Sequence, residues 1–312
     1  MSIVRLNSAY KDYIWGGDTL IRKFNKKYDG EILAESWELS CHKDGSSTIA
    51  SGEYTGKTLV EYIEAKGGEI LGKNSNAFEC FPILIKLIDV KNDMSIQVHP
   101  GDEFALKNEG QYGKTEVWYI VDCKEDSFLY YGFNREITKE EFRSRIEDNT
   151  ILEVLKKQPV KKGEIYFVEA GTLHAIGKGI VVAEIQQNSN VTYRVYDFNR
   201  TSVSGTKREL HIDKAVEVTK REVIKKEENN SKHLISCKYF TVDKVLLDSK
   251  TDSFIGNADE KSFVSLLIID GEGQIKTKDE SMDYIKGDSF FIDANNGKYE
   301  IIGDGEIIVT TV

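Results

Sequence analysis

The chain has 312 residues, and its 42 basic and 52 acidic side chains give a formal net charge of −10. That charge disfavours nucleic acid and anionic lipid as partners, and we expect neither to bind. No run approaches the roughly 20 apolar residues of a membrane span, and no apolar signal segment opens the chain. Four cysteines far apart in sequence predict reduced thiols, so we expect a cytoplasmic protein.

Short runs of alternating or continuous apolar residues recur along the chain and predict strands. Turns rich in Gly, Asn and Asp separate these runs, a pattern typical of a β sandwich or barrel. The predicted strands, in chain order, are Ser36–Leu39, Ile83–Leu87, Ser95–Val98, Glu116–Val121, Ile165–Val168, Val181–Ile185, Phe240–Leu247, Val264–Ile269, Ser289–Ile292 and Tyr299–Ile302.

Three stretches have helical spacing of their apolar residues instead. Thr58–Lys66 follows a Thr that suits an N-cap, and Asp213–Thr219 predicts a short helix. The longest prediction is Thr138–Lys157, where Thr138 and Glu141 match a capping box. We expect this stretch to form a small helical insertion near residues 138–158 of a mainly β chain.

Two segments in the turns repeat the same spacing. GEIYFVEAGTLH runs from Gly163 to His174, and GDSFFIDANNGK runs from Gly287 to Lys298. The first resembles the second signature of the cupin superfamily, G-x5-P-x-G-x2-H, with Glu169 in place of the proline. The resemblance implies two cupin-like jelly-roll units. We predict a metal-binding catalytic domain over residues 1–230 and a degenerate domain without metal ligands over residues 231–312.

Four side chains form the predicted metal site of the first unit. Residues two apart in a strand share a face, so Gln97 and His99 point the same way. If that face and the face bearing Glu116 line one barrel, they converge with His174 of the cupin signature. Nitrogen and oxygen ligands suit Zn²⁺, and also Fe, Mn, Co or Ni. An amide is a weak donor, which leaves the ion a stronger Lewis acid with a position for substrate.

These residues lie in longer stretches that resemble the short bacterial form of type I phosphomannose isomerase, also called mannose-6-phosphate isomerase. The similarity extends from about Ala9 to Arg200 and is thinner in the C-terminal unit. The stretches that carry it are AYKDYIWGG, ESWELS, the Gln-x-His-Pro around Gln97, GKTE, GTLHAIG and EIQQNSNVTYRVYDFNR. The resemblance implies a zinc-dependent aldose–ketose isomerase, with one Zn²⁺ per chain, that interconverts mannose 6-phosphate and fructose 6-phosphate through an enediol.

The same resemblance implies roles for individual positions. The metal ligands fall on the four residues above, and Lys114 and Arg194 take catalytic places. Lys86 and Ser95 are implied to bind the substrate. Longer family members carry an acidic residue four positions before the arginine, where this chain has Asn190. A mechanism that uses this acidic residue as the catalytic base therefore fails for this chain, unless another residue takes its place.

The base stays open among Glu169, Glu184, Lys114 and a metal-bound hydroxide. Two other functions also stay open: a non-catalytic cupin that binds a sugar for regulation, and an oxygenase or epimerase on the same scaffold. Lysines that anchor a phosphate are not needed by an oxygenase, which favours the isomerase. We expect a small sugar phosphate as the partner and a monomer as the oligomeric state.

Overall fold

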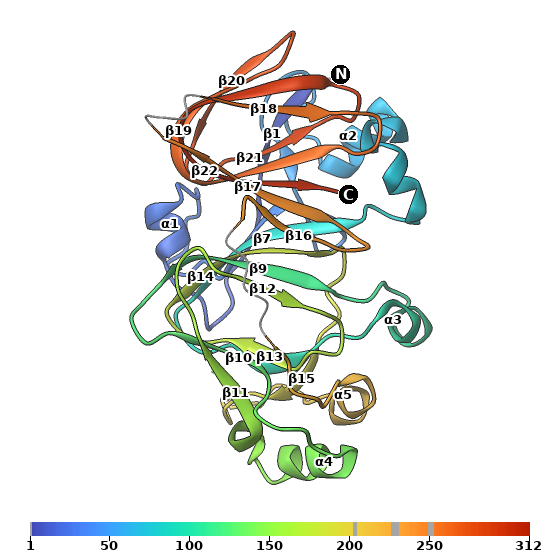
Figure 1. The fold of residues 1–312 in the computed structure, drawn as a ribbon, viewed down its shortest axis with the longest axis vertical. Coiled ribbons are helices and arrows are strands. Elements are labelled where there is room, and N and C mark those ends of the chain that lie inside the picture. Colours follow the sequence, from blue (N-terminus) through green and yellow to red (C-terminus); the bar gives the residue numbers. More distant parts are fainter. Residues whose placement is uncertain (1, 202–204, 226–230, 249–252) are drawn as a thin grey trace. The chain divides into compact units, whose positions relative to one another are not determined.

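The computed structural model describes residues 2–201, 205–225, 231–248 and 253–312, and its chain divides into two compact units (Figure 1). The first unit comprises Met1–Asp12, Asp18–Leu87 and Asn229–Val312, and the second comprises Tyr13–Gly17 and Ile88–Glu228. Strands dominate both units, which confirms the mainly β prediction. The domain boundary at residue 230 stays a prediction. The first unit combines N-terminal residues with the C-terminal segment, whereas the prediction assigned them to separate domains.

An antiparallel sheet of nine strands, counted within the described residues, dominates the first unit. Its order is β16-β17-β22-β19-β21-β1-β6, with β18 beside β22 and β20 beside β19. Ile3 of β1 lies opposite Ile292 of β21, so the N-terminal strand completes the C-terminal sheet. The strands are β1 (Ile3–Asn7), β6 (Thr48–Ile49), β16 (His233–Ser236), β17 (Thr241–Leu247), β18 (Ser253–Ala258), β19 (Val264–Lys276), β20 (Ser281–Ile285), β21 (Ser289–Ile292) and β22 (Gly297–Thr311).

The first unit also holds the strand path β7-β3-β2, a small hairpin and its helices. The predicted Thr cap of α2 is confirmed and belongs to a capping box that was not predicted: Glu61 N donates to the Thr58 hydroxyl, and Thr58 N donates to the Glu61 carboxylate. Within the described residues, no helix is both long and apolar enough for a membrane crossing. The elements are β2 (Ala9–Lys11), α1 (Thr19–Lys23), β3 (Glu35–Leu39), β4 (Cys41–His42), β5 (Gly45–Ser46), α2 (Leu59–Lys66), the 3-10 helices Gly68–Leu71 and Lys73–Ala77, and β7 (Ile83–Val90).

The second unit contains two groups of strands, and its described residues do not form a closed barrel. One has the order β12-β9-β14 and the other has the order β11-β10-β13-β8-β15. The strands are β8 (Ile96–Val98), β9 (Glu116–Cys123), β10 (Phe128–Phe133), β11 (Leu155–Pro159), β12 (Ile165–Val168), β13 (His174–Ile176), β14 (Ile180–Gln187) and β15 (Tyr193–Tyr196). The helices are α3 (Asp102–Glu109), α4 (Lys139–Glu147), the 3-10 helix Ile151–Val154 and α5 (Ile212–Val218).

The five-stranded sheet of the second unit has two unlike faces. One face packs on helices α4 and α5, and its core includes Val98, Ala175 and Val195 from three strands together with Phe142 and Val216 from the helices (Figure 1). Side chains alternate between the faces along each strand. Residues that neighbour these core positions in sequence therefore point to the opposite face, where the predicted ligands lie.

The predicted helix Thr138–Lys157 is correct at its start and wrong in its second half. The Thr138 hydroxyl accepts from Glu141 N, and α4 follows as expected. The helix ends at Glu147 because Asn149 adopts a left-handed conformation with φ 59°. A 3-10 turn and strand β11 occupy the remainder, so apolar residues assigned to a helical stripe belong to three different elements. The short helix α5 agrees with the prediction to within one residue.

Candidate metal centre

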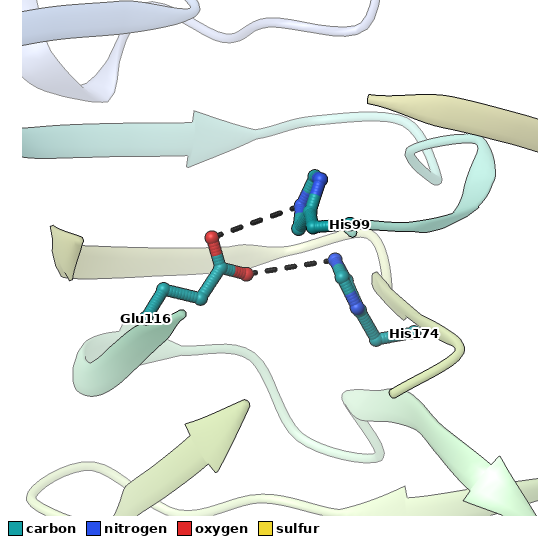
Figure 2. A group of neighbouring side chains, drawn as sticks. All are labelled: His99, Glu116 and His174. Carbon is teal, nitrogen blue, oxygen red and sulfur yellow. Dashed lines mark ion pairs between the residues drawn. The ribbon is translucent and has the colours of Figure 1, made fainter. Parts of the chain in front are cut away.

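Two imidazoles and one carboxylate form a buried cluster in the second unit. Figure 2 shows the carboxylate of Glu116 facing the rings of His99 and His174, with one oxygen towards each ring. Glu116 Oε1 lies 3.5 Å from His174 Nε2, and Glu116 Oε2 lies 3.8 Å from His99 Nε2. One ligand atom from each residue lies within 4.8 Å of the others, and all three side chains are buried. The cluster therefore presents two nitrogen donors and one oxygen donor to a single point.

The two groups of strands in the second unit bring these residues together. Glu116 begins β9, in the group β12-β9-β14, whereas His174 begins β13 in the five-stranded sheet. His99 directly follows β8 of that same sheet. The cluster thus joins two strand groups that face each other, and each contributes from the end of a strand.

Gln97 and Arg194 share the face of the sheet that bears His174. In the strand register Gln97 lies opposite His174 on β13 and opposite Arg194 on β15. Directly opposed residues of antiparallel strands project to the same side. His174, Gln97 and Arg194 therefore form one row across three strands. The row supports the predicted role of Gln97 as the fourth ligand, which stays a prediction.

The hydrogen bonds of the two histidines suit metal binding. His99 Nδ1 lies 2.8 Å from Val191 O, and His174 Nδ1 lies 2.8 Å from Thr172 O. Because a carbonyl oxygen only accepts, each Nδ1 carries the proton and each Nε2 presents a lone pair towards Glu116. His174 Nε2 is buried and makes no hydrogen bond among the described residues. Burial also lowers the pKa of His174 to about 4, which keeps the imidazole neutral at neutral pH.

Lys114 and Glu184 lie beside the cluster and set its charge. Lys114 Nζ lies 2.7 Å from Glu116 Oε2, 3.2 Å from His99 Nε2 and 3.6 Å from Glu184 Oε1. Trp118 Nε1 donates to Glu184 Oε2 at 2.9 Å, and all these side chains are buried. Two carboxylates against one ammonium leave one excess negative charge. That balance and the neutral imidazoles fit a divalent cation held by these residues.

The polar end of β14 holds the segment that carries Lys114 and Glu116. Gln187 Oε1 accepts from Thr115 N at 2.9 Å, and Gln187 Nε2 donates to Asp102 Oδ1 at 2.8 Å. Gln187 itself is buried. The sequence prediction gave Gln187 no role, although a run of polar residues directly after an apolar strand is a signal for such a scaffold. The bond fixes the backbone between the two functional side chains.

Arg194 is half-buried next to a second residue that the sequence prediction left without a role. Arg194 N donates to His211 Nδ1 at 3.1 Å, and Arg194 Nη1 donates to Glu209 O at 3.0 Å. Burial, and then the charge of Arg208, lower the pKa of Arg194 from its ordinary value. Ser95 is also buried and directly precedes β8, which carries Gln97.

The structure also describes the surroundings of two other predicted residues. Lys86 belongs to the first unit, where its ammonium is buried 3.4 Å from Glu35 Oε2 and 5.0 Å from the centre of the Trp37 ring. Its substrate contact stays a prediction. Glu169 is more than half exposed and pairs with Lys220 at 2.7 Å. Of the two carboxylates proposed as the base, Glu184 is the one beside the cluster.

Two family descriptions match separate parts of the chain. Residues 3–117 match the catalytic domain of type I phosphomannose isomerase, and residues 229–312 match the cupin domain of mannose-6-phosphate isomerase. The first match includes Gln97, His99, Lys114 and Glu116. The second match covers the unit for which the sequence predicted a cupin frame without ligands.

Full-length relatives carry the same description. The putative mannose-6-phosphate isomerase YvyI of Bacillus subtilis is 38% identical and covers 100% of this chain and 99% of its own. Mannose-6-phosphate isomerase ManA of the same organism is 36% identical, over 97% and 96% of the two chains. A crystal structure of the mannose 6-phosphate isomerase from B. subtilis superposes with a TM-score of 0.90 at 36% identity, and both chains are covered completely.

Proposed function

The chain belongs to the type I mannose-6-phosphate isomerase family, and from that premise we propose that it interconverts mannose 6-phosphate and fructose 6-phosphate. The observation that carries the proposal is the buried cluster of His99, Glu116 and His174 with Lys114 and Glu184 beside it. Such a set supplies both donors for a cation and groups that move a proton.

The metal of this site is proposed to be one Zn²⁺ held by Gln97, His99, Glu116 and His174. Neutral Nε2 atoms and a carboxylate are donors that Zn²⁺ accepts readily. An ion held there would supply Lewis acidity, which would stabilise negative charge that develops on the substrate. The second hydrogen bond of each imidazole, to a backbone carbonyl, holds the rings in the orientation that binding needs.

Glu184 is the residue we assign as base. The reaction moves one proton from C2 to C1 and one from the C2 hydroxyl to the C1 oxygen through an enediol, with no net change in atoms or charge. Glu184 Oε1 lies 3.6 Å from Lys114 Nζ beside the cluster, and Trp118 Nε1 donates to Glu184 Oε2 and holds the carboxylate there. It accepts the proton at one carbon and returns it at the other.

Lys114 and Arg194 supply positive charge around the reacting atoms. Lys114 stands within hydrogen-bond distance of Glu116 and His99, and preorganised charge of this kind contributes roughly 3 kcal/mol for one donor. Arg194 lies on the same face as Gln97 and extends the positive region along the row. Ser95 and Lys86 are proposed to bind the substrate, which uses remote binding energy to orient the sugar.

The cellular setting follows from the same reasoning. All four cysteines are free, which agrees with a reducing compartment, and we place the enzyme in the cytoplasm. The proposed metal ligands, base and Arg194 all come from the second unit of one chain. We therefore propose that a monomer is active.

A coupled assay tests the function directly. Purified protein with mannose 6-phosphate should form fructose 6-phosphate, treatment with EDTA should abolish turnover, and Zn²⁺ should restore it. Metal content measured on each sample links the activity to the ion. A fully metal-loaded protein that binds the sugar phosphate without turning it over would support the non-catalytic cupin instead.

A further inference from the structure

The turn that leads from β14 to β15 is buried, unlike most connections between strands. Gln186, Gln187, Ser189 and Val191 are all buried residues. Loops usually lie at the surface, because a buried loop must satisfy its backbone groups within the protein. Here a side chain does so, since Gln186 Nε2 donates to Gln187 O at 2.8 Å and to Ser189 O at 2.6 Å. The turn is therefore held in one conformation by its own residues.

Ser189 lies at the centre of this turn, and its side chain joins two distant segments. The Ser189 hydroxyl donates to Tyr112 O at 2.8 Å, a residue 77 positions away in the chain. It also accepts from Val191 N at 3.3 Å. Ser189 is 0% exposed, and a buried hydroxyl costs free energy unless it is hydrogen-bonded. Its donor and an acceptor position are both used, so the hydroxyl is a cross-link between the turn and the segment that ends in Tyr112.

Both of the joined segments carry residues of the candidate metal centre. Val191 O accepts from His99 Nδ1 at 2.8 Å, the contact that leaves His99 Nε2 available to a metal. Tyr112 precedes Lys114 by two residues, and Lys114 N donates to Pro100 O at 3.0 Å, directly after His99. One buried hydroxyl therefore links the acceptor of the His99 imidazole to the segment that carries Lys114.

The position of the Val191 carbonyl depends on the Ser189 hydroxyl. The Val191 side chain packs in the core of the five-stranded sheet, its N–H bonds Ser189, and its carbonyl faces His99. Without the hydroxyl, the Val191 N–H loses this acceptor inside the protein, a loss that costs free energy and that a shift of the turn relieves. A shifted carbonyl turns the imidazole, whereas metal–ligand distances tolerate deviations of only about 0.2 Å.

We propose that Ser189 is a positioning residue of the metal centre, which acts through Val191 to hold His99 in its metal-binding orientation. The inference rests on the proposed function, because it takes the cluster to be the metal site, and it deepens that proposal. Gln187 holds the backbone next to Glu116 from the same turn. The turn thus fixes one ligand from each strand group, Glu116 through Gln187 and His99 through Ser189.

The test replaces Ser189 by Ala and measures Zn²⁺ affinity by competition with a chelating dye. We expect Zn²⁺ to bind about 10-fold to 100-fold more weakly, as for other partners behind metal-ligating histidines. Co²⁺ serves as the spectroscopic probe, because its visible absorption reports the geometry of its ligands. At saturating Co²⁺ the bands of Ser189→Ala should differ from those of the wild type, which a general loss of stability would not cause.

A double-mutant cycle tests the path through His99. His99→Ala removes the imidazole, so in that background the further change Ser189→Ala should alter Zn²⁺ affinity by less than about twofold. The unfolding temperature of each variant checks that the fold is retained. The same full loss of affinity in both backgrounds would show that the hydroxyl does not act through His99 and would overturn the proposal.

Ser262→Ala is the matched control. Ser262 is a buried serine of the first unit, and its hydroxyl likewise donates to a backbone carbonyl, Phe263 O at 2.6 Å, and accepts from a backbone amide, Val312 N at 2.9 Å. Zn²⁺ affinity and the Co²⁺ spectrum should stay as in the wild type, while the unfolding temperature falls. Equal losses of affinity in Ser262→Ala and Ser189→Ala would trace the effect to destabilisation and overturn the positioning role.

The outcomes for Ser189 and for the enzymatic function are distinguishable. A folded Ser189→Ala variant with the Zn²⁺ affinity and Co²⁺ spectrum of the wild type would overturn the positioning role and leave wild-type turnover untouched. If the wild type binds Zn²⁺ without isomerising the sugar, and Ser189→Ala weakens that binding, the positioning role stands and the isomerase function falls. A wild type that binds neither ion would overturn the metal site and the role of Ser189 together.

Discussion

The segments Gly163–His174 and Gly287–Lys298 lie in different units and share one backbone frame. Gly163 N donates to Ile120 O at 2.8 Å in the second unit, and Gly287 N donates to Ile268 O at 2.9 Å in the first. Both glycines have positive φ, at 88° and 90°. Each segment then pairs with the preceding strand, β12 with β9 and β21 with β19. The repeat predicted from spacing is therefore a repeat of structure.

The side chains on that shared frame differ at the positions that decide what each unit can bind. Val168 of β12 lies opposite Glu116, whereas Ile292 of β21 lies opposite Val264, which is buried in a hydrophobic core. His174 is buried in the metal cluster, and its counterpart Lys298 is exposed. Glycines and strand pairing thus set the frame, while a few side chains decide between a polar site and an apolar core.

Glu116→Val tests this contrast most strongly, because it gives the second unit the residue of the first. The variant loses the carboxylate between His99 and His174, so we expect loss of bound metal and a fall in kcat/KM of at least about 1000-fold. Metal analysis and the coupled assay measure both effects. Metal content and activity close to the wild type would show that Glu116 is not a ligand.

The matched control is Val264→Ala at the equivalent position. It removes two buried methyl groups from the core of the first unit and should lower the free energy of unfolding by about 2 kcal/mol. Metal content and kcat should stay unchanged, since the position contributes packing alone. Urea unfolding and the coupled assay check the two expectations separately.

The sequence predicted the parts of the site that depend on local spacing and resemblance. His99, Glu116 and His174 meet as expected, because alternation along a strand and the cupin turn fix where they point. It gave no role to Gln187 or His211, whose partners Thr115 and Arg194 lie far away in sequence. Such contacts depend on how strands pair, and a single sequence does not encode that pairing as a local pattern.

The fold shows the same division between local and distant information. The start of α4 was predictable from the Thr138 cap, but the end was not, because an apolar stripe at helical spacing also suits a 3-10 turn followed by a strand. The placement of β1 next to β21 joins residues almost 300 positions apart. Tertiary packing decides both features. Within the predicted helix Thr138–Lys157 it overrides the helical spacing of the second half.

Gln187→Leu changes a residue that positions the site and is not one of the proposed metal ligands. Without the amide, Thr115 N loses its acceptor, and the segment with Lys114 and Glu116 is held less firmly, by its backbone hydrogen bonds alone. We expect kcat to fall about 10-fold to 100-fold, with metal affinity reduced to a similar degree, as for other partners behind metal ligands. Steady-state kinetics at saturating Zn²⁺ separate the loss of metal from the loss of positioning.

Gln274→Leu is the matched control for this change. Gln274 Nε2 also donates to a carboxylate, Asp283 Oδ1 at 2.8 Å, but on the exposed edge of the first unit. Kinetics and metal affinity should stay at wild-type values. Equal losses in the two variants would mean that the effect of Gln187 comes from general destabilisation and not from the site.

Asp293 and Glu169 occupy equivalent places in the two segments, and they give the prediction with the smallest expected effect on activity. Glu169 pairs with Lys220 at the surface, whereas Asp293 is fully buried and accepts from Tyr62 Oη at 2.8 Å and from Ser2 N at 3.0 Å. Burial raises the pKa of Asp293 above its ordinary value. Asp293 therefore couples the stability of the first unit to pH.

The sign of that coupling follows from proton binding. Between the ordinary pKa of Asp and the raised pKa of folded Asp293, the folded chain holds a proton that the unfolded chain releases. The stability from this group is present at low pH and is lost as pH rises through the folded pKa. Asp293→Asn cannot titrate, so the wild type should gain unfolding free energy relative to the variant between pH 7.5 and pH 5.

Urea unfolding of both proteins at the two pH values measures this difference, because the contributions of all other titrating groups cancel between them. The kcat should change by less than about twofold, since the site lies in the other unit. A difference that stays constant, or that moves in favour of the variant on acidification, would show that Asp293 is charged in the folded protein and that its hydrogen bonds outweigh its burial.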